Sequence, residues 1–237
     1  MKKLFVTGLL LTSLFLLAQS PEKIVDDYFK SLGGDLEKVH AILQKGKMKI
    51  NGMEFPMENY QDTSGKIYSK INMMGKEITV VAFDGKNGYM FDDATFSYRD
   101  IPDSLKQDLR EKARNIFGYL YNYKQNKTEL KYLGLQKIDG KELQAVKARF
   151  AKPIEGKVQE MILYFNPDTH LIELMKVYAG DIIGYNKIPE YKNFDGYYFP
   201  AKIITEVDGV EVNNITFDQI IVNPPEPDPS VFIKPEN

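Results

Sequence analysis

The first hydrophobic pattern along this chain has helical spacing. Ser20-Pro21-Glu22 has the residue types that begin helices: a hydroxyl N-cap, a proline in the first turn and an acidic neighbour. The apolar stripe behind it consists of Ile24, Val25, Tyr28, Phe29 and Leu32. Gly33-Gly34 predicts the end of this helix, and Asp35 predicts a second short one carrying Leu36, Val39 and Ile42. Helices this short are unstable alone, so both stripes should pack on another element.

From Gln44 onward the period changes to two, which is typical of half-buried strands. Turn dipeptides such as Asn51-Gly52 and Asp84-Gly85 separate the alternating runs. The runs are too closely spaced for parallel crossovers, so they predict antiparallel hairpins. The alternating apolar positions include Met48, Ile50, Met53, Phe55, Met57, Ile67, Ile71, Met73, Ile78 and Val80. Two aromatic-rich strands follow, with Tyr89, Phe91, Phe96 and Tyr98.

One further helix is predicted after Asp103. Ser104 and Gln107 have the spacing of a capping box. The apolar stripe behind them consists of Leu105, Leu109, Ala113, Ile116, Phe117 and Leu120. An aromatic tail with Tyr119, Tyr121 and Tyr123 continues past its last turns.

Strands resume at Leu130 and continue to a proline-rich tail, residues 223–237. The tail should be extended, solvated or laid along a sheet edge, because proline cannot donate to a strand ladder. About eleven strands and about three helices predict an α+β, mainly β fold with one dominant antiparallel sheet. We expect an open, unclosed barrel with the helices packed in its concave face. The space between helices and sheet is then either filled core or a cavity.

The first 18 residues have the pattern of a secretory signal peptide. Two lysines precede an uncharged run from Leu4 to Ala18, which is 15 residues and shorter than the roughly 20 needed to span a bilayer. We expect cleavage near Ala18 and a single domain over residues 19–237; the alternative is an uncleaved anchor. No later segment is apolar for long enough to span a membrane, so we expect a soluble, exported protein.

Composition and motifs exclude several classes of function. The chain has 31 basic and 33 acidic residues, which gives no electrostatic footprint for nucleic acid. The absence of cysteine removes thiolate nucleophiles and Cys-ligated metals. The two histidines, His40 and His170, form no zinc-ligand pattern, and no Gly-x-Ser-x-Gly elbow is present. We therefore expect no enzyme, no metal and no cofactor.

The methionines of the first hairpins suggest a binding surface. Five methionines, Met48, Met53, Met57, Met73 and Met74, fall within neighbouring strands. Methionine adapts its shape to varied apolar partners, but it also fills gaps in ordinary cores, and both interpretations stay open. The candidate lipid-binding cavity consists of Met53, Phe55, Met57, Ile71, Met73, Val80, Phe117, Leu120 and Tyr121. The aromatic strands at Tyr89–Tyr98 are either core or the mouth of this cavity.

Several ordered landmarks resemble the outer-membrane lipoprotein-sorting-like proteins, relatives of the periplasmic lipoprotein carrier and its outer-membrane acceptor. The landmarks are Asp84-Gly85-Lys86-Asn87-Gly88-Tyr89, Ile138-Asp139-Gly140-Lys141-Glu142, Tyr164-Phe165-Asn166 with Thr169 and Leu171-Ile172, Tyr191 with Asp195-Gly196 and Phe199-Pro200, and Asn223-Pro224-Pro225 with Ser230 and Phe232. The resemblance implies an unclosed barrel with a hydrophobic cavity for lipoprotein acyl chains. One feature differs: the carrier has a functional arginine on an early strand, whereas Met48–Ile71 contains none.

The sequence thus favours a periplasmic carrier that binds lipid or lipoprotein acyl chains and functions in outer-membrane biogenesis. We expect a monomer whose partners are these chains and an envelope donor or acceptor protein. The alternative is an envelope protein–protein interaction module with a filled core and no lipid ligand.

Overall fold

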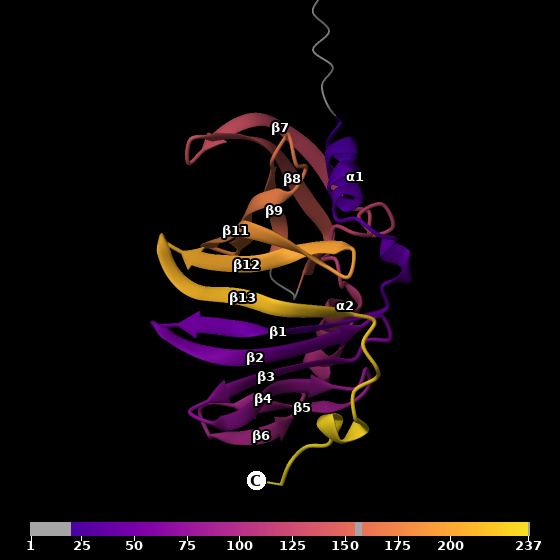
Figure 1. Ribbon diagram of the computed structural model, residues 1–237, viewed down its shortest axis with the longest axis vertical. Coiled ribbons are helices and arrows are strands. Elements are labelled where there is room, and N and C mark those ends of the chain that lie inside the picture. The colour runs from indigo at the N-terminus through magenta and orange to yellow at the C-terminus, as the bar shows by residue number, and fades with distance from the viewer. Residues whose placement is uncertain (1–19, 155–157, 237) are drawn as a thin grey trace, which may run out of the picture.

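The computed structural model describes residues 20–154 and 158–236, which form one antiparallel sheet of thirteen strands (Figure 1). The expected signal peptide, residues 1–18, lies outside the described residues. The strands are β1 (Ala41–Ile50), β2 (Met53–Asp62), β3 (Ile67–Met73), β4 (Lys76–Phe83), β5 (Gly88–Asp92), β6 (Ser97–Asp100), β7 (Glu129–Ile138), β8 (Lys141–Ile154), β9 (Val158–Phe165), β10 (Ile172–Ala179), β11 (Ile182–Phe194), β12 (Tyr197–Val207) and β13 (Val210–Val222). The helices are α1 (Pro21–Ser31), α2 (Asp103–Arg114) and the short 3₁₀ helices η1 (Leu36–Lys38) and η2 (Pro229–Phe232).

Two meanders meet at the centre of this sheet. The strand order is β6-β5-β4-β3-β2-β1-β13-β12-β11-β10-β9-β8-β7, so β1 pairs with β13 and the two outermost strands, β6 and β7, are the ends of an unclosed sheet. The expected class is confirmed, but the expected eleven strands are too few. One turn that the prediction missed lies between β10 and β11 at Gly180, whose φ is 64°, although Gly180-Asp181 was an available turn signal.

Helix α1 confirms the first predicted helix. The Ser20 side chain accepts a hydrogen bond from the Lys23 backbone N–H at 3.1 Å, as an N-cap should. The buried side chains of the helix, with Leu32 just behind it, pack against β8, β9 and β10. Gly34 lies against the ring of Tyr197 so closely that a Cβ there would be 2.2 Å from the ring. Glycine at position 34 therefore allows the chain that follows α1 to pack directly against Tyr197 of β12.

The other two helical predictions are partly wrong. The second helix is only the 3₁₀ turn η1, and Ile42 lies in β1 opposite Val222. Strand pairing therefore overrides helical spacing there. Helix α2 ends at Arg114 rather than near Leu120, and its N-cap is Pro102, with no capping box at Ser104. Residues 115–127 are a series of turns, here called the 115–127 segment.

Both α helices pack on one face of the sheet, here called the inner face. On β1–β4, Ile42, Gln61, Ile67 and Phe83 lie opposite one another in the pairing register and so share a face. Ile67 and Phe83 contact α2, whose Ala113 is fully buried there. Phe117 packs against both the cluster that contains Ile42 and the cluster under α1, so the two helices cover the same face.

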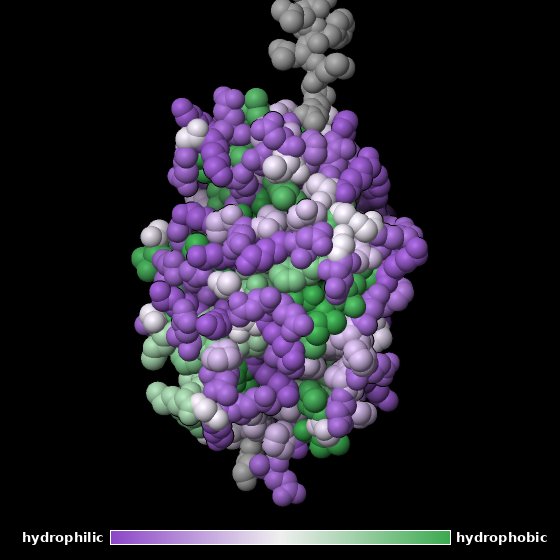
Figure 2. Space-filling model, viewed as in Figure 1, coloured by the Kyte–Doolittle hydropathy of each residue, from purple (hydrophilic) through white to green (hydrophobic). Residues whose placement is uncertain are grey.

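The proline-rich tail crosses the opposite, outer face rather than a sheet edge. The Tyr89 hydroxyl donates to the Val231 carbonyl at 2.9 Å, and the Phe232 ring meets the Tyr68 ring edge to face at 6.4 Å. Tyr89 and Tyr98 therefore belong to outer-face packing and do not form a cavity mouth. Over β1, β2 and β13 this face combines hydrophilic residues along its middle with apolar patches toward its sides (Figure 2), and it has ion pairs such as Lys45–Glu58 at 3.1 Å.

Asn223 fastens this tail to the start of β1. Its Oδ1 accepts from the His40 and Ala41 backbone N–H groups at 2.7 and 3.2 Å, and its Nδ2 donates to the Lys38 carbonyl at 2.9 Å. Asn223 also has a positive φ of 51°, which asparagine tolerates better than alanine.

Replacing Asn223 with alanine should therefore lower the free energy of unfolding by about 2–3 kcal/mol, because three hydrogen bonds are lost at a strained backbone position. Urea denaturation measures this loss. Asn214→Ala is the matched control, since Asn214 donates one 3.3 Å bond to Glu211. Equal effects of the two substitutions would contradict the assigned role of Asn223.

Candidate functional site

The inner face brings together five of the nine residues predicted to line a cavity: Phe55, Met57, Ile71, Phe117 and Tyr121. Met57, 8% exposed, lies in a buried cluster against which Ile71 and Phe117 pack. Phe55 is half-buried on β2 and points to the same side as Met57, two residues away. Tyr121 joins them through its ring, whose centroid is 5.3 Å from that of Phe117.

Four other predicted residues lie elsewhere. Leu120 is buried in the neighbouring cluster beneath α1. Met53 and Met73 lie at strand ends beside hairpin turns and are exposed. Val80 is exposed on β4 beside an irregularity in the pairing of β3 with β4. Alternation with a period of two predicts which face of the sheet a residue lies on. It does not predict how deeply that residue is buried, which depends on its position along the strand.

The cluster around Met57, here called the central cluster, spans both meanders. Across β1, β2 and β3, Gly46 pairs with Met57 and Met57 with Ile71. A Cβ at Gly46 would lie 2.0 Å from the Thr216 carbonyl oxygen, so only glycine fits there. The remaining members from β12 and β13, which the candidate cavity did not include, are Tyr197, Phe199, Ile203, Ile215, Phe217, Ile220 and Val222.

A hollow of about 470 Å³ opens beside the central cluster, between α1, η1, the β2–β3 turn and the 115–127 segment. Val39, Ile116 and Phe117 line this hollow and also belong to or pack on the central cluster. Its rim is charged, with Asp26 and Lys124 among the lining residues. This volume is in the range of small-molecule sites, roughly 300–1,000 Å³.

Phe117 both lines the hollow and packs on the central cluster. Its ring stacks on that of Phe199 at 5.8 Å and contacts Tyr121, whose ring in turn meets Phe29 of α1 at 5.3 Å. Four aromatic rings therefore link α1 to β12 through the 115–127 segment. Because this segment has no regular helical ladder along its length, it is the part of the site best suited to move.

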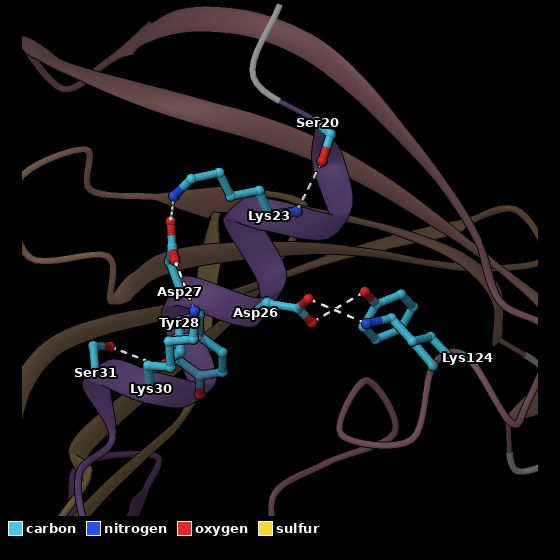
Figure 3. A network of polar contacts seen from close by, with 9 residues as sticks. Ser20, Lys23, Asp26, Asp27, Tyr28, Lys30, Ser31 and Lys124 are labelled. Atoms are coloured by element: carbon cyan, nitrogen blue, oxygen red, sulfur yellow. Dashed lines mark hydrogen bonds and ion pairs between the residues drawn. The ribbon is translucent and has the colours of Figure 1, made fainter.

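A polar network ties the same segment to α1 (Figure 3). Asp26 accepts from the Tyr123 hydroxyl at 3.0 Å and from the Lys124 ammonium at 3.2 Å. Burial, together with the adjacent Asp26 carboxylate, raises the pKa of Tyr123, while Lys124 acts in the opposite direction. Nearby on α1, the hydrogen bond from Lys23 lowers the pKa of Asp27. These contacts at the rim are partly exposed, so they position the segment without locking it.

Tyr28 anchors α1 to the sheet, with its ring 5.8 Å from that of Phe165. Burial raises the pKa of Tyr28 to about 12, above the ordinary value near 10. The folded state therefore keeps the proton that the unfolded state loses first. This contribution to stability is complete below pH 10 and disappears as the pH rises through 12.

The protein should therefore lose about 3 kcal/mol of unfolding free energy between pH 10 and 12 through Tyr28 alone. Urea denaturation across that range measures the loss, and Tyr28→Phe should reduce its slope. Tyr132→Phe, on β7, is the comparison variant. An identical pH dependence in wild type and Tyr28→Phe would show that this hydroxyl does not set the alkaline limit.

The described residues contain no candidate metal-binding cluster. No group of three His, Asp or Glu side chains that could hold a metal ion occurs within residues 20–154 and 158–236. His40 lines the hollow, whereas His170 lies in the β9–β10 turn. In the same ranges, no helix has the length and apolar character needed to cross a bilayer.

Comparison with solved structures confirms the expected resemblance at the level of the fold. A DUF1329 family protein from Desulfovibrio piger superposes with a TM-score of 0.59 at 12% identity, covering 90% of this chain and 99% of the other. A LolA superfamily protein from Nitrosomonas europaea gives 0.58 at 12% identity, with 90% and 97% covered. A domain assigned to the outer membrane lipoprotein-sorting proteins, from Vibrio parahaemolyticus, gives 0.55 at 9% identity, with 90% and 97% covered.

Sequence comparisons add no closer relative. No protein-family model matches this chain, and no curated protein matches it. The similarity is therefore one of architecture, a mainly β unclosed sheet with helices on its inner face.

Proposed function

We propose that this protein is a periplasmic carrier that binds lipid or the acyl chains of lipoproteins on the inner face of its sheet. The observation that carries the proposal is the position of Phe117. This one side chain lines a 470 Å³ hollow, packs on the central cluster and stacks on Phe199. The fold shared with a LolA superfamily protein and with a lipoprotein-sorting domain supports the same function.

In this proposal an acyl chain enters through the hollow and displaces Phe117 from Phe199. The chain then packs along Met57, Ile71 and the apolar residues of β12 and β13. Each buried methylene contributes about 0.8 kcal/mol, so ten of them supply about 8 kcal/mol before the cost of association. Transfer needs only a difference in affinity between donor, carrier and acceptor. No covalent step is required, so we do not propose an enzyme.

Titration with a fluorescent fatty acid tests this function. The protein should bind the fatty acid saturably, with a fixed number of molecules per protein chain. Unlabelled lipids of the same chain length should compete with it. Fluorescence that never saturates, or that lipids cannot displace, would contradict the proposal.

A protein–protein interaction module is the second candidate. It is favoured by the cluster beneath α1, where Val25, Val146 and Phe165 are fully buried, as in a filled core. In that case the central cluster stays closed, and the chain binds an envelope protein through its surface. The same titration separates the two candidates, because this module binds no acyl chain.

A further inference from the structure

A second hollow adjoins the first along the end of α2 and the 115–127 segment, and its lining has a different character. Its volume is about 550 Å³, and it shares Arg114, Asn122 and Gln125 with the lining of the first hollow. It is formed where the end of α2 and residues 125–128 approach β8. We call it the basic hollow.

Three cationic side chains from separate parts of the chain line the basic hollow: Arg114, Lys127 and Lys152. The one acidic residue in the lining is Glu111, whose Oε1 already accepts from Gln107 at 3.0 Å. The Arg114 guanidinium reaches the Ser64 carbonyl oxygen at 3.4 Å. Within residues 20–154 and 158–236, none of the three cations forms an ion pair. The whole chain is slightly acidic, so this local excess of positive charge is not a consequence of composition.

The rest of the lining supplies hydrogen-bond donors and an apolar floor. Side-chain amides come from Asn122, Gln125 and Asn126, whereas the amide of Asn115 already donates to the Glu111 carbonyl at 2.7 Å. Thr128 is only 9% exposed, and its hydroxyl oxygen is buried without a hydrogen-bond partner. Phe150 lines the floor and belongs to the buried cluster beneath α1. Cations and neutral donors next to an apolar floor suit the junction between a polar head and a hydrocarbon tail.

We propose that the basic hollow binds the anionic phosphate of a lipid headgroup whose acyl chains occupy the inner face. This proposal rests on the proposed function and deepens it, because it makes the cargo an anionic phospholipid rather than a neutral lipid. Lys127 and Lys152 contact the phosphate oxygens through ammonium groups on flexible side chains. Arg114 can donate two parallel hydrogen bonds from its planar guanidinium. The side chains of Arg114, Lys127 and Lys152 are exposed to solvent, so salt weakens their contact with the phosphate.

The test compares two lipids that share both acyl chains, phosphatidylglycerol and diacylglycerol, by their dissociation constants with the full protein. Wild type should bind phosphatidylglycerol at least about tenfold more tightly, since a charge-assisted contact contributes about that factor. The preference should fall toward one in Lys127→Gln/Lys152→Gln and in high salt. Lys131→Gln/Lys137→Gln, on exposed positions of β7, is the matched control and should keep the preference.

Two results would overturn the proposal: equal affinities in wild type, or a preference that Lys127→Gln/Lys152→Gln leaves unchanged. Binding of inorganic phosphate shows whether the hollow recognises a free phosphate as well as the phosphate of a lipid headgroup. If phosphate binds with the same dependence on the lysines while neither lipid binds, the anion site is supported and the carrier function fails. If diacylglycerol binds as well as phosphatidylglycerol and phosphate does not bind, the carrier function is supported and the headgroup site fails.

Thr128→Val provides an independent readout. Valine has nearly the same shape as threonine and removes the unpartnered hydroxyl, so a structural role predicts equal or greater stability with unchanged lipid preference. A headgroup contact predicts unchanged or greater stability together with a severalfold lower affinity for phosphatidylglycerol. Unchanged affinity would remove Thr128 from the site.

Discussion

Replacing Phe117 with aspartate should weaken acyl-chain binding by at least about a hundredfold. The substitution removes the ring that stacks on Phe199 and places a carboxylate at a position that lines the hollow and packs on the central cluster. An acyl chain packed there would desolvate this charge, which costs several kcal/mol, and about 3 kcal/mol already corresponds to a hundredfold change in affinity. Titration of the variant with the fluorescent fatty acid measures the effect.

The fold should tolerate this change, because Phe117 is half-buried in a segment of turns rather than in the sheet. Changing Met57 as well would be less informative, since a carboxylate at this buried position would also destabilise the sheet. Phe96→Asp is the matched control: Phe96 is 80% exposed at the β5–β6 turn. Wild-type affinity in Phe117→Asp would contradict the assigned path of the acyl chain.

Replacing Phe165 with alanine should lower the free energy of unfolding by about 3–5 kcal/mol. Phe165 is 0% exposed at the end of β9, beneath α1, and its ring meets that of Tyr28 edge to face. The substitution leaves a cavity at a position held by α1 on one side and by the sheet on the other, so little of the lost packing can be recovered.

Chemical denaturation of Phe165→Ala and Phe96→Ala measures the effect of the same substitution at a buried and at an exposed position. The exposed Phe96 should change stability by less than about 0.5 kcal/mol. A loss below 1 kcal/mol in Phe165→Ala would mean that α1 does not rest on this part of the inner face.

The parts of the fold that depend on neighbours in sequence were predictable. Helix α1 was predicted from Ser20, Pro21 and its apolar stripe, because capping and helical spacing are local effects. The hairpins of the first meander were similarly predicted from their turn dipeptides. The length of α2 was overestimated, because Ile116 and Phe117 fall at helical spacing although they reach the inner face from turns. Asn115 and Gly118, the latter with a φ of 80°, were the available signs of a break.

The candidate site depends on contacts that the sequence does not reveal. Pairing of β1 with β13 joins residues about 170 positions apart, such as Met48 and Ile215, and no local pattern specifies it. Phe199 could have been included, because it lies in the alternating run of residues 197–207. The charged rim around Asp26 and Lys124 gave no signal, since these residues meet only when the 115–127 segment folds back on α1.

The aromatic strands show the same limit from the other side of the sheet. Tyr89 and Tyr98 are residue types expected at the mouth of a cavity. The proline-rich tail, however, packs over the face on which they lie. Alternation assigns residues to a face, while the partner that covers each face is decided by the rest of the chain.

Native mass spectrometry of the protein purified from its own envelope fraction tests the carrier function most directly. A carrier should show a discrete excess of mass, of the size of a lipid or acylated ligand, that is lost on denaturation. The mass of the bare chain, unchanged after incubation with phospholipid vesicles, would contradict it and favour the protein–protein interaction module.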